Sequence, residues 1–198
     1  MDGSRENGIG AAKRALELSA PLYSLWLRPE SSWGVELEAT MNELSPYFKV
    51  PKFLPHTTVQ GDLALPLEGI RAGIRPRLEG LKALGLEIAA AEESEEFFRS
   101  LYLRFSPSRD FDQFQELSAA SLGTRNGLSP FPHLSLSYGN LPSRERKRYL
   151  ADRLSDRFSG RRMVFSSLAL TLSASSLPIG LWEVIEEFRF ESPARGCA

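Results

Sequence analysis

The chain has 198 residues, of which 42% are hydrophobic and 25% are charged, and its formal net charge is −1 at pH 7. This length suits one domain or two closely packed lobes, and the composition is that of an ordinary globular protein. The near-neutral charge disfavours a general attraction to long nucleic acids or acidic membranes, while a local site for a small anion stays compatible.

Cysteine usage and the start of the chain both favour the cytosol. The single cysteine, Cys197, lies next to the C-terminus, so the fold cannot depend on an internal disulfide. The sequence holds no run of about 18 apolar residues. Residues 1–7 lack the apolar core of a secretory signal. We therefore expect a cytoplasmic monomer without a membrane partner.

The first element in chain order is a peripheral extension. Residues 1–20 are glycine-rich at their start and are predicted to be flexible, with a short helix possible over 11–19. The folded domain is predicted over 21–192, followed by a tail at 193–198. A strand over 23–27 opens the domain, since this segment is rich in aromatic and aliphatic residues and Pro29 stops it.

A helix is expected after this strand and runs to about residue 47. Ser31 or Ser32 is predicted to cap its N-terminus, because serine hydroxyls accept hydrogen bonds from the free amides of the first turn. The apolar spacing predicts a buried stripe that includes Val35, Leu37, Met41 and Leu44.

The middle of the chain predicts a second helical stretch over 65–84, which Pro76 should kink or split. A strand over 86–91 and a returning strand over 97–105 flank the acidic segment 92–96, which we interpret as a solvated turn. A helix over 110–122 is then expected, with Gly123 as its C-cap.

The last third predicts a charged helix over 143–158 and strands over 163–173 and 181–190. The basic run 144–148 could grip a second phosphate or an RNA backbone, but we interpret it as a solvated helix face. Large aromatic residues are taken first as core candidates, with Trp182 also able to line a cleft; these are Phe97, Phe98, Tyr102, Phe105 and Trp182.

The two histidines of the chain, His56 and His133, occur in near-copies of one phrase. Each reads Pro-His-x-(Thr or Ser)-aliphatic, with Thr58 and Ser135 two residues after the histidine. Residues i and i+2 of a strand point to the same face, so each phrase presents an imidazole beside a hydroxyl. The similar order of elements around the phrases indicates a duplicated α+β fold, with both histidine strands lining a cleft between two lobes.

Two imidazoles facing each other can serve as one base and one acid at neutral pH, because the ordinary histidine pKa is near 6.5. The hydroxyls suit the oxygens of a phosphate. No metal or other cofactor is expected, since the pattern lacks a third histidine or a cysteine cluster, and Asp62 with two distant histidines makes a poor zinc site. The sequence has no Gly-x-Ser-x-Gly elbow and no phosphate-binding P-loop.

With these features the sequence resembles the 2H phosphoesterase superfamily, and within it the cyclic phosphodiesterases of plants and yeast. The resemblance spans residues 21 to about 190, and Tyr138, five residues after His133, favours the cyclic phosphodiesterase branch. It is carried by three stretches: Tyr23–Trp26 with Pro29 soon after, Phe53–Val59 and Pro132–Tyr138.

The resemblance implies a bilobal duplicated fold, with two antiparallel-sheet lobes, outer helices and a central cleft. It implies metal-independent hydrolysis of small cyclic phosphates: a nucleoside 2′,3′-cyclic phosphate to the 2′-phosphate, or ADP-ribose 1″,2″-cyclic phosphate, formed in tRNA splicing, to ADP-ribose 1″-phosphate. His133 would be the base and His56 the acid, an order that the symmetry of the site makes reversible. Thr58 and Ser135 would bind the phosphate, and Trp26 and Tyr138 would contact the nucleoside.

Two alternatives stay open at this point. An RNA-processing 2H enzyme, such as a 2′,5′-phosphodiesterase, a ligase-like enzyme or a 3′-end exonuclease, would share the histidines and hold a longer polymer at the flanks. A non-catalytic nucleotide-binding module would share the fold, although a pure binder does not need two titratable groups. Turnover of 2′,3′-cyclic AMP, as opposed to affinity alone, separates an enzyme from such a module.

Overall fold

The computed structural model describes residues 21–191. The helix expected over 11–19, the tail at 193–198 and Cys197 lie outside the described residues. The strands are β1 (Tyr23–Pro29), β2 (Thr57–Leu63), β3 (Leu84–Glu93), β4 (Leu101–Phe105), β5 (His133–Ser137), β6 (Arg162–Leu172) and β7 (Glu183–Arg189). The helices are α2 (Ser31–Phe48), α3 (Leu67–Leu78), α4 (Arg109–Leu122) and α5 (Arg144–Phe158), with short 3₁₀ turns η1 (Phe97–Arg99) and η2 (Ile179–Leu181).

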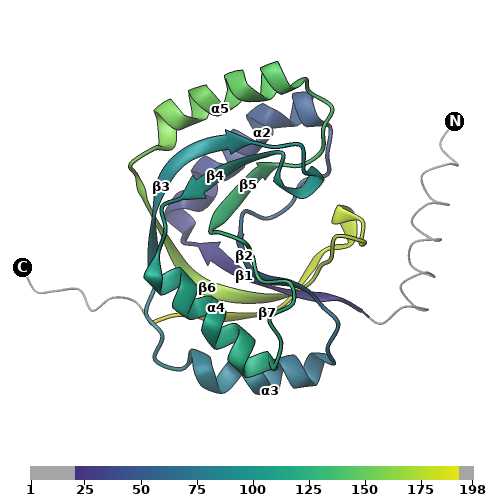
Figure 1. Cartoon of the computed structure of the whole chain (residues 1–198), viewed down its shortest axis with the longest axis vertical. Coiled ribbons are helices and arrows are strands. Elements are labelled where there is room, and N and C mark those ends of the chain that lie inside the picture. The colour runs from purple at the N-terminus through teal and green to yellow at the C-terminus, as the bar shows by residue number, and fades with distance from the viewer. Residues whose placement is uncertain (1–20, 192–198) are drawn as a thin grey trace, which may run out of the picture.

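The strands form one strongly curved antiparallel sheet. Its order is β2-β1-β6-β3-β4-β5, and β7 pairs with the other side of β6. Strand β3 joins the two lobes, since its start pairs with β6 and its end pairs with β4. Figure 1 shows the resulting C shape, in which the terminal strands β2 and β5 approach each other across the opening. The predicted bilobal α+β fold is therefore confirmed, and both histidine strands lie at the ends of the sheet.

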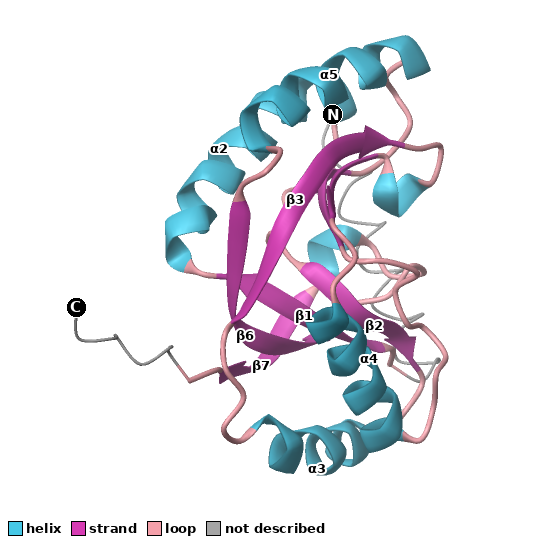
Figure 2. Cartoon of the chain, turned by 60° about the vertical axis from the view of Figure 1, so that its left-hand side comes forward, coloured by secondary structure: helices cyan, strands magenta, loops and turns pink. Residues whose placement is uncertain are grey.

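The helices lie on the outside of the curved sheet, as Figure 2 shows. Helix α2 precedes β2 in the chain but packs against β5, and helix α4 precedes β5 but packs against β2. Helix α5 covers β3, and α3 packs on α4. Each histidine strand is therefore supported by a helix from the other half of the chain, which fixes the two halves relative to each other.

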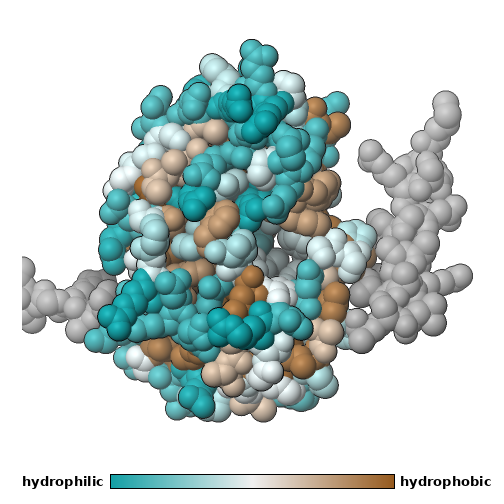
Figure 3. All heavy atoms as spheres, in the orientation of Figure 1, coloured by the Kyte–Doolittle hydropathy of each residue, from teal (hydrophilic) through white to brown (hydrophobic). Residues whose placement is uncertain are grey.

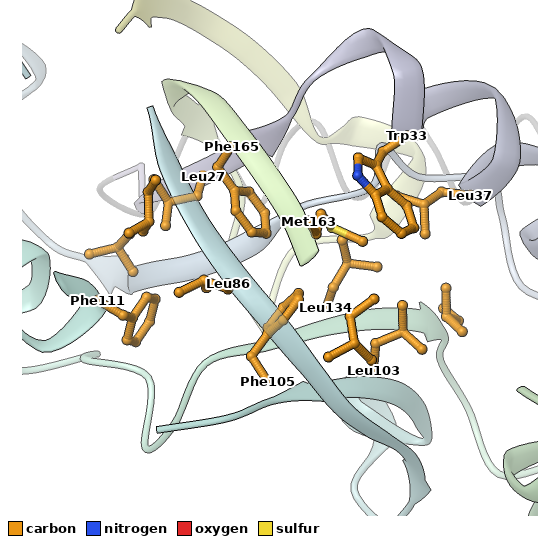
Figure 4. Packing of buried hydrophobic residues seen from close by; sticks show 14 of the residues in the cluster. Leu27, Trp33, Leu37, Leu86, Leu103, Phe105, Phe111, Leu134, Met163 and Phe165 are labelled. Carbon is orange, nitrogen blue, oxygen red and sulfur yellow. The ribbon is translucent and has the colours of Figure 1, made fainter. Parts of the chain in front are cut away.

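A continuous apolar core lies between the sheet and these helices (Figure 4). Leu27 and Phe165 from the central strands are fully buried, and the ring of Phe165 meets that of Phe105 edge-on at 5.6 Å. Each such side chain contributes about 1.5–3 kcal/mol to stability when it leaves water. The core thus provides a rigid base beneath the strands that carry the histidines.

The first predicted helix is confirmed as α2, but two of its details were wrong. Val35 was placed on the buried stripe and is instead 77% exposed, whereas Trp33 is buried against Phe158. The N-cap is Glu30 without a side-chain cap, because the Ser32 hydroxyl donates to the Glu30 carboxylate.

Two elements predicted for the middle of the chain are shorter in the structure. The helix expected over 65–84 ends at Leu78, two residues after Pro76, and Leu84 already belongs to β3. The strand expected over 97–105 begins only at Leu101, because Phe97 to Arg99 form η1. Phe97 was a core candidate and is 49% exposed.

The basic run on α5 was interpreted as a solvated face, and this was wrong for Lys147. Lys147 is fully buried, and its Nζ donates to the Ser94 carbonyl at 2.6 Å and to Asn140 Oδ1 at 3.1 Å. It thereby ties the β3–β4 connection to the segment after β5. Arg144 and Arg148 remain exposed beside Glu93.

The face in Figure 3 is mainly hydrophilic over the upper helices and carries scattered apolar patches. No helix among residues 21–191 combines the length and apolarity that crossing a bilayer requires.

Candidate active site

Both histidine phrases open onto one cavity of about 260 Å³ between the ends of the sheet. His56 immediately precedes β2, and His133 is the first residue of β5. All six residues singled out from the sequence line this cavity: Trp26, His56, Thr58, His133, Ser135 and Tyr138. The fold therefore brings together residues that lie far apart in the chain.

The backbone holds the two imidazoles in the same way. His56 Nδ1 lies 2.6 Å from the carbonyl oxygen of Leu54, and His133 Nδ1 lies 3.0 Å from that of Phe131. A carbonyl oxygen can only accept, so each Nδ1 carries the proton and each Nε2 of the neutral ring is a free acceptor. Either histidine can therefore take a proton at Nε2 or, once charged, return one from it.

The duplication extends to the aromatic residue opposite each hydroxyl. In the sheet register Trp26 pairs with Thr58, and Tyr102 pairs with Ser135. Trp26 stacks on His56 with centroids 3.7 Å apart and planes at 9°. Tyr102 meets His133 edge-on at 5.6 Å. The aromatic neighbours thus hold both rings, but with a full stack on one side and an edge contact on the other.

The surroundings of His56 strongly favour the neutral ring. Burial lowers the pKa of His56 from 6.5 to about 3, and the charges of Arg28 and His133 act in the same direction against the hydrogen bond to Leu54. The Arg28 Nη1 donates to the carbonyl oxygen of Pro55 at 2.5 Å, which fixes the segment just before the histidine. Burial also lowers the pKa of Arg28.

The surroundings of His133 are more mixed. Burial lowers its pKa, the hydrogen bond to Phe131 raises it, and Arg99 and Arg104 lower it while Glu96 raises it. His133 is half-buried, whereas His56 is only 6% exposed. At neutral pH both rings are therefore mainly neutral.

The two hydroxyls differ in their present partners. Ser135 Oγ donates to the carbonyl oxygen of Phe98 at 3.0 Å and is buried. Thr58 is half-buried on β2 and forms no side-chain hydrogen bond within the part of the chain that the structure describes. Tyr138 is also buried, which raises the pKa of its phenol, and its hydroxyl interacts with Ser135. The phosphate-binding roles predicted for the hydroxyls remain predictions.

An aromatic wall closes one side of the cavity. Trp182 follows η2 and lies 5.7 Å from Trp26, 5.9 Å from Tyr138 and 5.9 Å from Phe98 by ring centroids. Sequence reasoning placed Trp182 and Phe98 in the core first, and both in fact line the cavity. No local pattern distinguishes these residues, because the far end of the chain brings Trp182 to the site.

A polar rim closes another side. Asp62, at a left-handed φ of 50°, accepts hydrogen bonds from the backbone and side chain of Ser175 at 2.8 and 2.9 Å. The amide of Gly61 donates to the carbonyl of Gly127 at 2.7 Å. A Cβ at Gly127 would lie 1.8 Å from the Gly61 oxygen, so only glycine fits there. Among residues 21–191, no three His, Cys, Asp or Glu side chains gather as metal ligands would.

A larger cavity of about 360 Å³ lies beyond Trp26 and Trp182, between α2 and residues 50–55. It contains neither histidine, and its lining is mainly apolar. We take the smaller cavity as the site, because the paired titratable groups converge there.

Comparison with known proteins gives a relative by sequence and neighbours by fold. A curated cyclic phosphodiesterase from Arabidopsis thaliana is 24% identical over 131 residues, which cover 66% of this chain and 72% of that protein. No family model matches the chain.

Solved structures show the same fold. Apo LigT of E. coli gives a TM-score of 0.56 at 14% identity, over 87% of this chain and 99% of LigT. TT0787 of Thermus thermophilus gives 0.60 at 14% identity, over 86% and 98%. LigT complexed with 3′-AMP gives 0.54 at 10% identity, over 87% and 99%. The predicted fold and the likeness to a cyclic phosphodiesterase are therefore confirmed, and the curated relative supports the prediction of a phosphodiesterase enzyme.

Proposed function

We propose that the protein hydrolyses small 2′,3′-cyclic phosphates without a metal ion, by acid–base catalysis between His56 and His133. The observation that carries this proposal is the convergence of both histidine–hydroxyl pairs on one cavity of about 260 Å³. Both Nε2 atoms are available because both Nδ1 atoms are used by backbone carbonyls. The likeness to the Arabidopsis cyclic phosphodiesterase supports the reaction class.

In the proposed step one imidazole Nε2 removes a proton from water, and the water oxygen forms a bond to phosphorus. The bond from phosphorus to the ribose 3′ oxygen breaks, and the other imidazolium protonates that oxygen. The product is the 2′-phosphate. Thr58 and Ser135 donate to the phosphate oxygens as their negative charge grows.

The electrostatics of the cavity favour His56 as the base. The acid must carry a proton when the substrate anion is bound. Burial disfavours the charged ring more strongly for His56 than for His133, so His133 takes the role of the acid and His56 that of the base. This order is the reverse of the one expected from the sequence. The same hydrogen bonds at Nδ1 would serve either order.

The aromatic wall supports a nucleoside as the carrier of the phosphate. Phe98 and Trp182 are half-buried rings in the lining of the cavity, and bases stack on such rings without needing a specific hydrogen-bond pattern. Trp26 and Tyr138 are 4% and 3% exposed, so their proposed contacts with the nucleoside are at the ring edges. The structure of LigT with 3′-AMP shows that a neighbour of this fold holds a nucleotide. ADP-ribose 1″,2″-cyclic phosphate is the second substrate within the proposal.

The test is incubation of the purified chain with 2′,3′-cyclic AMP in excess EDTA, with the product identified by phosphorus NMR. We expect 2′-AMP at an undiminished rate. Binding without turnover would contradict the proposal and point to a nucleotide-binding module. Cleavage of 2′,5′-linked or 3′-end RNA alone would also contradict it and move the histidine chemistry to RNA processing.

A further inference from the structure

Arg99 is the only lysine or arginine among the described residues that line the catalytic cavity, and nothing in the sequence singled it out. It closes η1 and stands beside Phe98, whose carbonyl accepts the hydrogen bond of Ser135. Its side chain is 16% exposed, so most of the cation is shielded from water. A shielded charge of this kind interacts more strongly with an anion than an exposed one does.

Most hydrogen-bond donors of Arg99 are unused in the described part of the chain. Nη2 donates to Glu96 Oε1 at 2.5 Å, and Nε is buried without a partner among residues 21–191. Buried donors without partners are rare, because each costs about 1–3 kcal/mol. They persist mainly where a ligand or a functional constraint accounts for them.

The guanidinium is held in place by aromatic packing. Its carbon lies 4.7 Å from the ring centroid of Phe131 and 5.8 Å from that of Tyr102. Arg104 packs on the same Phe131 ring at 4.4 Å, but it does not line the cavity and is 42% exposed. Phe131 also provides the carbonyl that holds His133. Arg99 is therefore fixed near His133 by Phe131, Tyr102 and its ion pair with Glu96.

We propose that Arg99 is an anion-binding residue of the cavity that donates to phosphate oxygens of the substrate. A planar guanidinium with free N–H groups matches two phosphate oxygens at once, which a lysine cannot do. This inference rests on the proposed function for the identity of the substrate, but not for the anion itself. The phosphate is either the cyclic one between the histidines or a second one on the same nucleotide.

The experiment compares Arg99→Met with Arg104→Met on two substrates, 2′,3′-cyclic AMP and its 5′-phosphorylated form. We expect Arg99→Met to raise KM about 10–10²-fold, the loss of a charged hydrogen bond to phosphate. A loss on both substrates assigns Arg99 to the cyclic phosphate, and a loss on the 5′-phosphorylated one alone assigns it to the second phosphate. Arg104→Met removes the other cation that packs on the Phe131 ring, but it removes no hydrogen-bond donor from the cavity. It should therefore change KM by less than about three-fold.

A binding measurement separates failure of this inference from failure of the proposed function. Calorimetry with inorganic phosphate should show at least about ten-fold weaker binding for Arg99→Met than for the unsubstituted chain, whether or not any substrate is turned over. Glu96→Gln breaks the same ion pair while keeping the guanidinium, and should bind phosphate more tightly. The proposal is overturned if Arg99→Met matches the unsubstituted chain in phosphate affinity, or if Glu96→Gln weakens binding as much as Arg99→Met does.

Discussion

The two histidine regions share a backbone design and differ in their electrostatics. In both, a carbonyl two residues upstream holds Nδ1, and an aromatic residue stands opposite the hydroxyl on the neighbouring strand. His56 is buried under Trp26, whereas His133 is half-buried and has Arg99, Arg104 and Glu96 around it. The fold thus holds the two proposed proton-transfer groups by the same backbone contact, and their surroundings give them different proton affinities.

The hydroxyls show the same division. Thr58 has its hydroxyl free among the described residues, while Ser135 uses its hydroxyl to hold Phe98 of η1. Ser135 therefore links the proposed phosphate site to the segment that carries Arg99, and Thr58 has no such contact among the described residues. The two halves are therefore alike in how they hold the imidazoles and differ in how they hold the hydroxyls.

Removing either histidine tests the part of the comparison in which the halves are equal. His56→Ala and His133→Ala should each lower kcat about 10²–10⁴-fold, since each deletes one proton-transfer group. The assay is initial rates on 2′,3′-cyclic AMP. Circular dichroism melting serves as the control for folding, with His56→Asn as a second variant because His56 supports the Trp26 stack. Near-full activity in either variant would rule out a two-histidine mechanism.

Removing either hydroxyl tests the part in which the halves differ. Thr58→Ala and Ser135→Ala should each lower kcat about 10–10³-fold through loss of a transition-state donor. Only Ser135→Ala should also reduce stability, by about 1 kcal/mol, since it alone breaks a hydrogen bond to the backbone. Urea unfolding of both variants measures this. Equal stability losses would show that the two hydroxyls are in fact equivalent in the free protein.

The sequence predicted the residues whose partners are near in the chain. An imidazole and a hydroxyl at i and i+2 share a face of any strand, so the pairs His56–Thr58 and His133–Ser135 could be recognised without the fold. That the pairs meet in one cavity also followed from the duplication.

Residues that reach the site through tertiary packing could not be recognised in this way. Arg99 looks like one residue of a strand in the sequence, and the chain there is instead bent into η1, where Ser94 Oγ donates to the Arg99 carbonyl at 2.6 Å. Trp182 reaches the cavity only because β7 returns along β6. The buried position of Lys147 likewise depends on two distant segments that accept its hydrogen bonds.

The pH dependence of kcat/KM tests whether burial sets the proton affinities. The pKa of both histidines is lowered in the free protein, so both limbs of the bell-shaped profile of kcat/KM against pH should lie below pH 6.5. The acidic limb should reflect His56, whose pKa is about 3. We expect the optimum to be mildly acidic. A profile centred between about pH 7 and 8 would show that the cavity does not disfavour the charged rings in solution.

The acid sensitivity of folding isolates the contribution of His56. Its pKa is about 3 in the folded protein and near 6.5 in the unfolded chain, so the unfolded state binds the proton first as the pH falls. This contribution to stability is complete above pH 6.5 and is lost progressively toward pH 3, amounting to about 2 kcal/mol between pH 7.5 and pH 5. Urea unfolding at these two pH values should therefore show a smaller difference for His56→Asn than for the unsubstituted chain. His133→Asn should reduce the difference less, since His133 is only half-buried, and equal effects of the two variants would mean that the two histidines are buried alike.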